Sequence, residues 1–339
     1  MRFQFYHAGL ENVPKLSVDG TVGNSIHFSH WEGNETPHEL RADTSTEIAL
    51  NLVASPKRLE LTRGIELVTN NHFDTDGVLS VWTVLTGERA LELRDKLIPA
   101  AEAGDFSEFR NEDEVRASIV IQGADQAGSQ NETTSLLARQ LAGEGDLDDA
   151  RCYELVLPEV ERVLTRTNEF EPLWREGWKQ IAAAMDSFER GTSRVEEYDD
   201  ARLSLISLAP DMFSPAGFSP TRHAAPYMAI SSYARGHLFL IAIPVSGGWF
   251  YRIDYPYYSW AETVVRPRIR RHDLSPLLSQ LNQLESGRAG NWKADNSEMT
   301  SAAKFLTPEG ELAASKLSPD VVSQTIRAQL LGKTRVQCV

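Results

Sequence analysis

Nineteen consecutive residues decide the fold, and they read Glu66-Leu-Val-Thr-Asn-Asn-His72-Phe-Asp74-Thr-Asp76-Gly77-Val-Leu-Ser-Val-Trp82-Thr-Val84. The apolar run over residues 65–71 predicts a strand, and the apolar spacing over residues 77–85 predicts a helix. A polar segment with the pattern His-x-Asp-x-Asp-Gly joins the two. Because Gly77 has no Cβ, the chain can turn tightly there and bring its backbone close to a bound group. We therefore expect a functional site where the strand passes into the helix.

The polar segment predicts a metal site. His72, Asp74 and Asp76 stand at i, i+2 and i+4, and alternate side chains of an extended chain point the same way, so they can converge on one cation. Imidazole and carboxylate together suit Mn²⁺, Fe²⁺ or Zn²⁺ better than Ca²⁺. Ligands of open α/β sheets bind beyond the carboxyl ends of the strands. In the alternative interpretation, Asp74 and Asp76 only cap the following helix, and His72 is a loop residue.

The flanking sequence predicts an α/β domain. Strands are expected over residues 3–6 and 25–30, and Thr44-Ser-Thr-Glu47 has the pattern of a capping box that begins a helix ending before Pro56. Alternating strands and helices are typical of a mostly parallel sheet flanked by helices. Helical spacing continues over residues 90–103, 153–166 and 172–189, whereas residues 112–122 fit a helix or a strand.

The character of the sequence changes after Gly191. Strands are expected over residues 201–208, 236–243 and 248–254, with a hairpin turn at Gly247-Gly248. Helices are expected over residues 273–286 and 319–331. We therefore predict an α/β domain over residues 1–190 and a second, smaller, β-rich α+β domain over residues 191–339.

The composition is that of a globular protein with an acidic balance. Of 339 residues, 41% are hydrophobic, and the net charge is -14. This charge argues against binding to duplex nucleic acid or to an anionic membrane, and it leaves the oligomeric state open. The two cysteines, Cys152 and Cys338, give no disulfide framework or zinc site, and neither a signal peptide nor a membrane span is evident. A cytoplasmic location is expected.

The hexapeptide His72–Gly77 resembles the first motif of the DHH phosphoesterase superfamily. That resemblance implies a two-domain hydrolase with a Mn²⁺ pair at the tips of a parallel sheet and a smaller C-terminal domain that closes over the substrate. It implies four metal ligands: His72, Asp74, Asp76 and Asp125. Asp105 is the other aspartate that could fill the place given to Asp125. The whole chain also resembles an uncharacterised bacterial family with the same motif.

The sequence departs from the superfamily pattern at its Asp-His-His triplet, because no two of the eight histidines are adjacent. His30, at the end of the strand expected over residues 25–30, could supply a ligand or a general acid/base beside the metal. Alternatively, His27 and His30 are hydrogen-bonded residues of the fold. Asp74 or Asp76 is expected to bridge the metals or to orient the nucleophile. Asp76 and His30 are the catalytic candidates, and Asp43 is a weaker candidate.

The C-terminal half contains candidate substrate-binding residues. An aromatic stretch over residues 249–260 precedes four arginines within residues 266–271, and arginine and aromatic side chains suit phosphate and nucleobase respectively. We expect Arg266, Arg268 and His223 to bind substrate, unless the stretch is a hairpin with core aromatics and a solvated basic loop. The sequence as a whole favours a Mn²⁺-dependent phosphoesterase acting on a small phosphorylated or nucleotide-like substrate. The alternatives are a catalytically degenerate binding protein and a hydrolase of a carboxylate or amide substrate.

Overall fold

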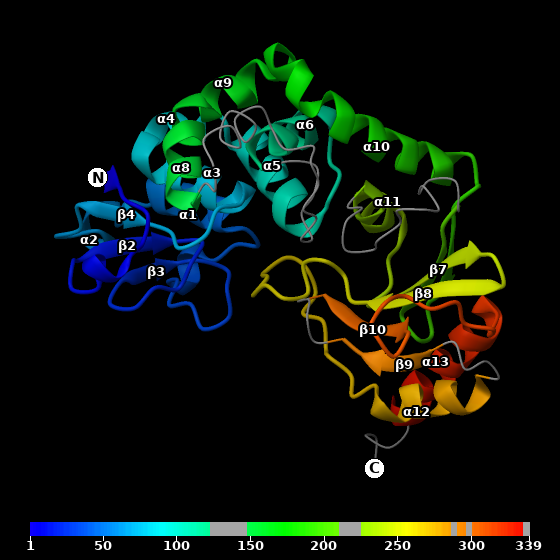
Figure 1. Ribbon diagram of the computed structural model, residues 1–339. Helices are drawn as coiled ribbons and strands as arrows, with labels where there is room; N and C mark the ends of the chain where they lie inside the picture. The colour runs from blue at the N-terminus through cyan, green and yellow to red at the C-terminus, as the bar shows by residue number, and fades with distance from the viewer. Residues whose placement is uncertain (123–147, 210–224, 286–289, 296–299, 335–339) are drawn as a thin grey trace. The chain divides into compact units, whose positions relative to one another are not determined.

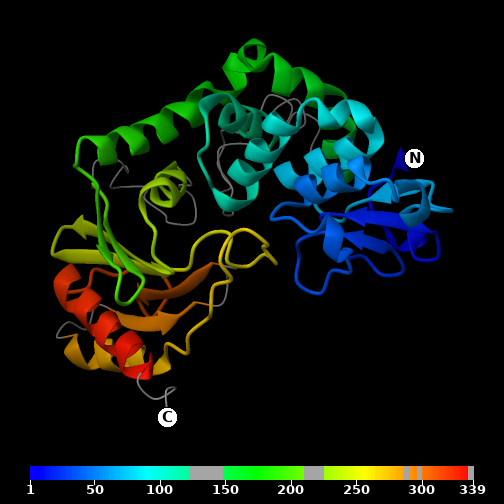
Figure 2. The same ribbon diagram turned by 180° about the vertical axis from the view of Figure 1, so that it is seen from behind.

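The computed structural model describes residues 1–122, 148–209, 225–285, 290–295 and 300–334 (Figures 1 and 2). The contacts between residues divide the chain into two compact units. The first unit contains Met1–Ile181, a short piece that ends at Met228, and the segment Trp260–Arg268. The chain passes into the second unit within helix α10 (Glu171–Glu189). The division into functional domains at residue 190 stays a prediction.

A parallel sheet forms the base of the first unit. Its strands, in spatial order, are β1 (Arg2–Phe3), β4 (Leu67–Thr69), β2 (Lys15–Val18) and β3 (Ile26–Phe28), and every pairing is parallel. The pairing of β1 continues past its end, since the Gln4 amide donates to the Val68 carbonyl at 3.1 Å. This sheet confirms the predicted α/β class.

Helices lie on this sheet or pack beside the helices that contact it. They are α1 (Ser45–Ala54), α2 (Arg58–Leu61), α3 (Thr75–Thr86), α4 (Glu88–Leu91), α5 (Arg94–Phe106), α6 (Glu112–Ile121), α8 (Asp149–Val156) and α9 (Val160–Thr165). Helix α3 contacts β1, β2 and β4, and α1 and α5 pack beside it (Figure 1). The apolar face of α3 is buried, with Val78, Leu79 and Val81 at 0% exposure. Burial of this face fixes α3 directly above the strand ends.

The local signals for these helices have mixed outcomes. The N-cap half of the predicted capping box is present, because the Thr44 side chain accepts from the Glu47 amide at the start of α1, while the Glu47 carboxylate binds Arg94. The region 112–122 is helical. The helix expected over residues 153–166 is interrupted by a 3-10 turn at Leu157–Glu159, where Pro158 has no amide hydrogen to donate. The expected single helix is therefore two helices, α8 and α9, with this turn between them.

The second unit is built on a mixed six-stranded sheet. Its strands, in spatial order, are β5 (Arg194–Tyr198), β6 (Leu203–Ser207), β7 (Leu238–Val245), β8 (Gly248–Asp254), β10 (Ser301–Leu306) and β9 (Asn291–Ala294). Only the β6–β7 pairing is parallel. The predicted hairpin between β7 and β8 is confirmed, and Gly247 at its turn has a φ of 86° that favours glycine.

Helices cover one face of this second sheet. Helix α12 (Ser275–Leu284) and helix α13 (Pro319–Thr334) pack on it in Figures 1 and 2, while α11 (Ala225–Tyr233) precedes β7 in the chain. Tyr251, Trp292 and Phe305 of the sheet and Leu281 and Ile326 of the helices meet in one buried cluster. The predicted second, β-rich α+β part is thereby confirmed.

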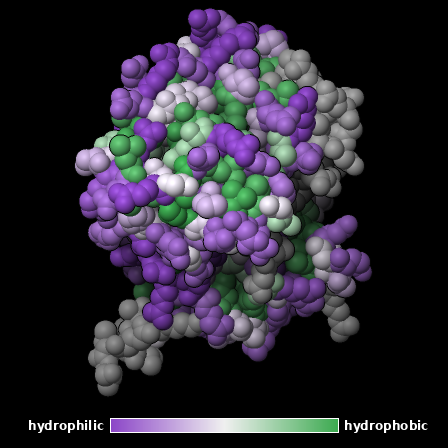
Figure 3. Space-filling view, turned by 90° about the vertical axis from the view of Figure 1, so that its left-hand side faces the viewer, coloured by the Kyte–Doolittle hydropathy of each residue, from purple (hydrophilic) through white to green (hydrophobic). Residues whose placement is uncertain are grey.

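One face of the molecule is mostly hydrophilic. Hydrophilic residues predominate on the face that Figure 3 shows, with hydrophobic residues between them. Among the residues that the structure describes, none of the helices combines the length and apolar character needed to cross a membrane.

Candidate metal centre

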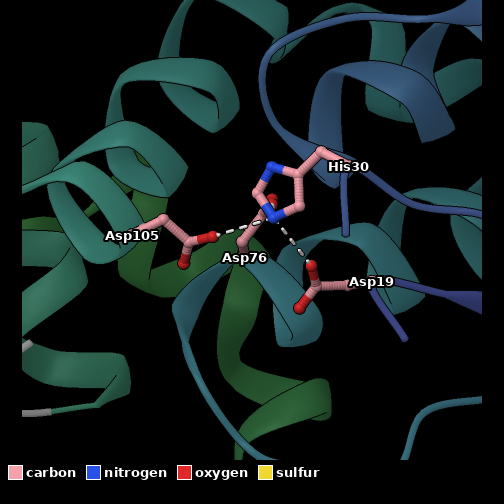
Figure 4. Close-up of side chains that lie close together, drawn as sticks. All are labelled: Asp19, His30, Asp76 and Asp105. Atoms are coloured by element: carbon pink, nitrogen blue, oxygen red, sulfur yellow. Dashed lines mark ion pairs between the residues drawn. The ribbon is translucent and has the colours of Figure 1, made fainter. Parts of the chain in front are cut away.

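Polar side chains gather at the carboxyl ends of three neighbouring strands. Asp19 directly follows β2, His30 follows β3, and His72 and Asp74 follow β4. Since all strands run parallel, these ends meet at one edge of the sheet, where ligands of α/β proteins bind. Four residues at this edge and on the helices above it are drawn in Figure 4.

The first group consists of Asp19, His30, Asp76 and Asp105, whose ligand atoms all lie within 4.8 Å of one another. His30 Nε2 lies 3.3 Å from Asp19 Oδ1, 3.2 Å from Asp105 Oδ2 and 3.7 Å from Asp76 Oδ2. Figure 4 shows the imidazole pointing one nitrogen at these carboxylates. The four side chains are at most 4% exposed. Three carboxylates and one imidazole are therefore enclosed in the protein.

The second group consists of Asp19, His72 and Asp74. His72 Nε2 lies 3.1 Å from Asp19 Oδ2 and 3.0 Å from Asp74 Oδ2. Asp19 thus belongs to both groups and turns one oxygen toward each histidine. His72 and Asp74 are 29% and 21% exposed, so the second group marks the side of the centre that faces solvent.

Both histidines are oriented by a bond at Nδ1. His30 Nδ1 donates to the backbone carbonyl of Asp43 at 2.7 Å, and His72 Nδ1 donates to the amide oxygen of Asn71 at 3.1 Å. A carbonyl oxygen can only accept, so Nδ1 bears the hydrogen in each ring. This is the arrangement of metal-binding histidines, because it leaves Nε2 aimed at the ligand position.

Several buried atoms of the centre face one another as ion pairs but make no hydrogen bond of good geometry to any described residue. They are Asp19 Oδ2, His30 Nε2, His72 Nε2 and Asp105 Oδ2. Buried polar atoms almost always have hydrogen-bond partners, so such a cluster needs an explanation. Facing oxygen and nitrogen donors fit divalent cations of the Mn²⁺, Fe²⁺ and Zn²⁺ type.

The helix above the sheet contributes Asp76. Its carboxylate accepts from the backbone amides of Ser45 at 2.6 Å and Thr46 at 2.7 Å, which begin helix α1. Asp76 also lies in the first turn of α3, so two helix N-termini stabilise its negative charge. These bonds hold the carboxylate in place beside His30.

The polar segment places its three candidate ligands in two groups. Strand β4 ends at Thr69 and helix α3 begins at Thr75, with Asp74 as its N-cap accepting from the Gly77 amide at 2.7 Å. Consequently Asp76 faces the first group, whereas His72 and Asp74 face the second. Asp74 caps the helix and pairs with His72 at the same time, so both interpretations of Asp74 apply.

Charge in the centre shifts the histidine pKa values upward. Burial lowers the pKa of His72, but the charges of Asp74 and Asp19 outweigh it and raise that pKa to about 12. Burial also lowers the pKa of His30, but the bonds to Asp105 and Asp19 outweigh it and raise that pKa well above its usual value. Without a cation, protonated imidazoles balance the carboxylates.

The pKa values of the carboxyl groups are shifted in different directions. Burial raises the pKa of Asp19, but bonds from His30 and His72 outweigh it and hold the value below normal. Burial and the charge of Asp19 raise the pKa of Asp76 to about 7. Burial and the charges of Asp74 and Asp76 raise the pKa of Asp105. Like charges this close favour a bound cation in place of the protons.

The backbone around the centre is tightly packed. Asp19 has a φ of 55°, in the left-handed region that few residues other than glycine adopt. A Cβ on Gly77 would lie 2.4 Å from Asn70 Nδ2 and 2.6 Å from the Tyr153 hydroxyl. Other groups approach the Gly77 backbone closely, as expected, but they are the Asn70 and Tyr153 side chains and not a bound group. Strain at such positions is typical of functional sites.

A model of a family of unknown function (DUF6687) matches residues 1–334. The chain belongs to this family. No curated protein has a similar sequence. Among solved structures, the DUF6687 chain is similar to the pGpG-specific phosphodiesterase PggH from Vibrio cholerae, with 10% sequence identity and a TM-score of 0.33, over 94% of this chain and 99% of that chain. A TM-score this low supports no conclusion about the activity of the DUF6687 chain.

The structure brings together five residues named from the sequence of this DUF6687 protein: His30, His72, Asp74, Asp76 and Asp105. Asp125 and His223 lie outside the described residues. Arg268 is exposed, and the Arg266 guanidinium binds the carboxylates of Asp43, Glu102 and Glu108. Substrate binding by the two arginines stays a prediction.

Sequence reasoning missed Asp19, the residue common to both groups of the DUF6687 centre. Asp19-Gly20 has the pattern of a turn, but Leu16 and Val18 alternate with polar residues before it. That alternation, followed by Asp-Gly, is a short strand ending in a carboxylate, as the structure has it.

Proposed function

We propose that this chain is a metal-dependent hydrolase that cleaves phosphoester bonds in a small phosphorylated or nucleotide-like substrate. The main support is the position of Asp19, which belongs to two groups of histidine and carboxylate side chains that could each hold a cation. A carboxylate shared by two cations is the arrangement by which two-metal sites clamp both oxygens of a phosphoryl displacement. The DHH-like motif at His72–Gly77 supports the same chemistry.

The donor sets favour Mn²⁺. The first cation would be held by His30, Asp76 and Asp105, the second by His72 and Asp74, and both by Asp19. Carboxylates in excess over imidazole suit Mn²⁺ better than softer metals. Of the two aspartates considered for the fourth ligand, Asp125 and Asp105, we propose Asp105, because it lies within the first group.

Bound cations supply hydroxide at neutral pH and a counter-charge for phosphoryl oxygens. The protein residues orient the reactants. The exposed sides of His72 and Asp74 give the substrate its approach. The amides of Ser45 and Thr46 fix the Asp76 carboxylate, which suits the proposed role of Asp76 in orienting the nucleophile. His30 is fully buried, with Nδ1 committed to Asp43, and this supports a ligand role over proton transfer.

A binding protein without turnover is the second candidate. The absence of adjacent histidines, which removes the Asp-His-His triplet, favours it. Such a protein would bind cations and a phosphorylated ligand through the same residues and release the ligand unchanged. The two candidates differ only in turnover, so one experiment separates them.

That experiment measures metal content and hydrolysis together. Purified protein is stripped with a chelator, reloaded with Mn²⁺, and assayed against mononucleotides, linear and cyclic dinucleotides and sugar phosphates. We expect about two equivalents of Mn²⁺ and turnover of at least one phosphoester. Asp105→Asn should bind about one equivalent of Mn²⁺ and lose turnover, because Asp105 belongs to the first group only. Asp95→Asn, which changes an exposed aspartate on the same helix α5, should keep both the metal and the turnover. Metal without turnover would establish the binding protein, and no metal would refute both candidates.

A further inference from the structure

The segment Trp260–Arg266, here called the strap, belongs to the first unit although it comes from the C-terminal half of the sequence. It contacts His30 twice. The Glu262 amide donates to the His30 carbonyl at 2.7 Å, and the Trp260 ring stands edge-on to the imidazole at 4.9 Å. The strap thus contacts both the backbone and the ring of a proposed ligand.

The strap also binds the residue that orients the His30 ring. The Asp43 carboxylate accepts from the backbone amides of Val264, Val265 at 2.8 Å and Arg266 at 3.0 Å, and from Arg266 Nη1 at 2.7 Å. Burial raises the pKa of Asp43, but these bonds outweigh it and lower that pKa. The Asp43 side chain is therefore a carboxylate that binds the strap through its negative charge. The backbone carbonyl of Asp43 in turn accepts from His30 Nδ1. Asp43 therefore connects the strap to the His30 imidazole, with its carboxylate bound to the strap and its carbonyl bound to the ring.

Arg266 extends the same connection to helix α5. Its Nη2 donates to Glu102 Oε1 at 2.8 Å and to Glu108 Oε2 at 2.6 Å, while Nε donates to Glu108 Oε1 at 2.7 Å. Glu102 lies one turn before Asp105 on α5. One guanidinium, 12% exposed, thus ties the segment that orients His30 to the helix that bears Asp105.

We infer that Arg266 is a positioning residue that sets the separation of His30 and Asp105, and through it the affinity of the first group for a divalent cation. The inference rests on the metal centre of the proposed function. This role is distinct from the substrate-binding role expected for Arg266, and it rests on the three carboxylates that the guanidinium binds. Residues that orient metal ligands typically change affinity about 10–100-fold when they are removed.

The chain offers a matched control. Arg110 donates to the same Glu102 oxygen at 2.7 Å, but it is 54% exposed and its ion pair is with Glu102 alone. Arg266→Ala and Arg110→Ala therefore remove the same kind of ion pair, with and without the connection to Asp43. Arg266→Lys keeps the charge and loses the planar fork that reaches several carboxylates. It serves as the milder variant if Arg266→Ala does not fold.

The first measurement is Mn²⁺ binding by the full-length chain, followed through the electron paramagnetic resonance signal of free Mn²⁺. Circular dichroism confirms that each variant is folded. We expect Arg266→Ala to weaken one of two Mn²⁺ sites about 10–100-fold, Arg266→Lys to weaken it less, and Arg110→Ala to change it less than about twofold. Wild-type affinity for both Mn²⁺ sites in folded Arg266→Ala and Arg266→Lys would overturn the inference.

The second measurement needs no metal. In chelator-treated protein, the imidazole ¹⁵N resonances of His30 report the bond from Nδ1 to Asp43. They should shift in Arg266→Ala and stay unchanged in Arg110→Ala. If wild-type protein bound no Mn²⁺, the proposed function would fail, and this measurement would still decide whether Arg266 positions His30. Unchanged His30 resonances in the Arg266 variants would then refute the positioning role.

Discussion

Asp19 Oδ2 lies 3.1 Å from His72 Nε2, while Asp19 Oδ1 lies 3.3 Å from His30 Nε2. One carboxylate at the end of β2 therefore joins the ends of its two neighbours, β3 and β4, in the sheet. Its Oδ1 is further fixed by the Ser45 hydroxyl at 2.8 Å. This geometry makes Asp19 the residue on which both groups depend.

Asp19→Asn should abolish binding at both groups, because an amide supplies neither the charge nor the second anionic oxygen. Asp76→Asn should affect the first group alone, since Asp76 is not among the residues of the second. We expect Mn²⁺ content to fall from about two equivalents to none in Asp19→Asn and to about one in Asp76→Asn. Elemental analysis of dialysed protein measures this. Equal content in the two variants would contradict the shared role of Asp19.

Mn²⁺ binding should tighten as the pH rises. The pKa of His72 is raised to about 12 and that of His30 is raised as well, so both rings are protonated in metal-free protein at neutral pH. A cation must displace those protons, and its affinity grows as they become easier to remove. Calorimetry in buffers of different ionisation enthalpy should detect proton release on binding. Binding without proton release would exclude the histidines as ligands.

The raised pKa values of His30 and His72 also make the stability of the metal-free protein depend on pH. Because the folded pKa values of His30 and His72 lie above the unfolded value near 6.5, their contribution is fully present below about pH 6.5. It is lost as the pH rises through the folded values. The metal-free protein should therefore become less stable in alkaline solution, whereas Mn²⁺ should offset this loss. Urea unfolding at several pH values, with and without Mn²⁺, tests both expectations.

Gly77→Ala should destabilise the protein. The added Cβ would lie 2.4 Å from Asn70 Nδ2 and 2.9 Å from Asp74 Oδ1, so these side chains would have to move. Overpacking of this kind costs about 1–3 kcal/mol. Gly23→Ala is the control, because nothing lies within 4 Å of a Cβ there. Urea unfolding should show a lower midpoint for Gly77→Ala only, and equal midpoints would contradict the close packing at α3.

Lys15→Met should destabilise the parallel sheet. Lys15 is fully buried, and its Nζ donates to the backbone carbonyls of Leu10, Glu11, Val13 and Asn24. Removing the donor leaves the buried Leu10 carbonyl unsatisfied, at about 1–3 kcal/mol, whereas the other three carbonyls are part-buried and cost less. Lys57→Met, which removes an exposed lysine paired with Glu39, should cost less than about 1 kcal/mol. Thermal unfolding of the two variants compares them directly.

The sequence predicts those features that depend on neighbouring residues. The strand before His72 and the helix after Asp74 follow from apolar periodicity, and Thr44 is a local cap. The β7–β8 hairpin follows from its two glycines. Each of these signals is contained within about twenty residues, so no knowledge of the rest of the fold is needed.

The remaining parts depend on contacts that the sequence does not display. Strand β2 contains Lys15, which suggests an exposed position until its carbonyl partners are known, and so Asp19 at its end was overlooked. Asp105 lies near the end of helix α5, where no strand-end rule applies. Arg266 stands more than two hundred positions after Asp43, and spacing says nothing about such a pair.

The distance of the strap from His30 in the sequence has a consequence for synthesis. Ribosomes add roughly 5–20 residues per second, so the strap emerges on the order of 10–50 s after His30. Joining such distant segments also carries a large loop-closure entropy. A nascent chain therefore presents Asp19, His30 and His72 before the strap can restrain them. Chains that terminate before Trp260 never acquire this restraint, and we expect them to hold a cation at His30 less tightly than the full-length chain does.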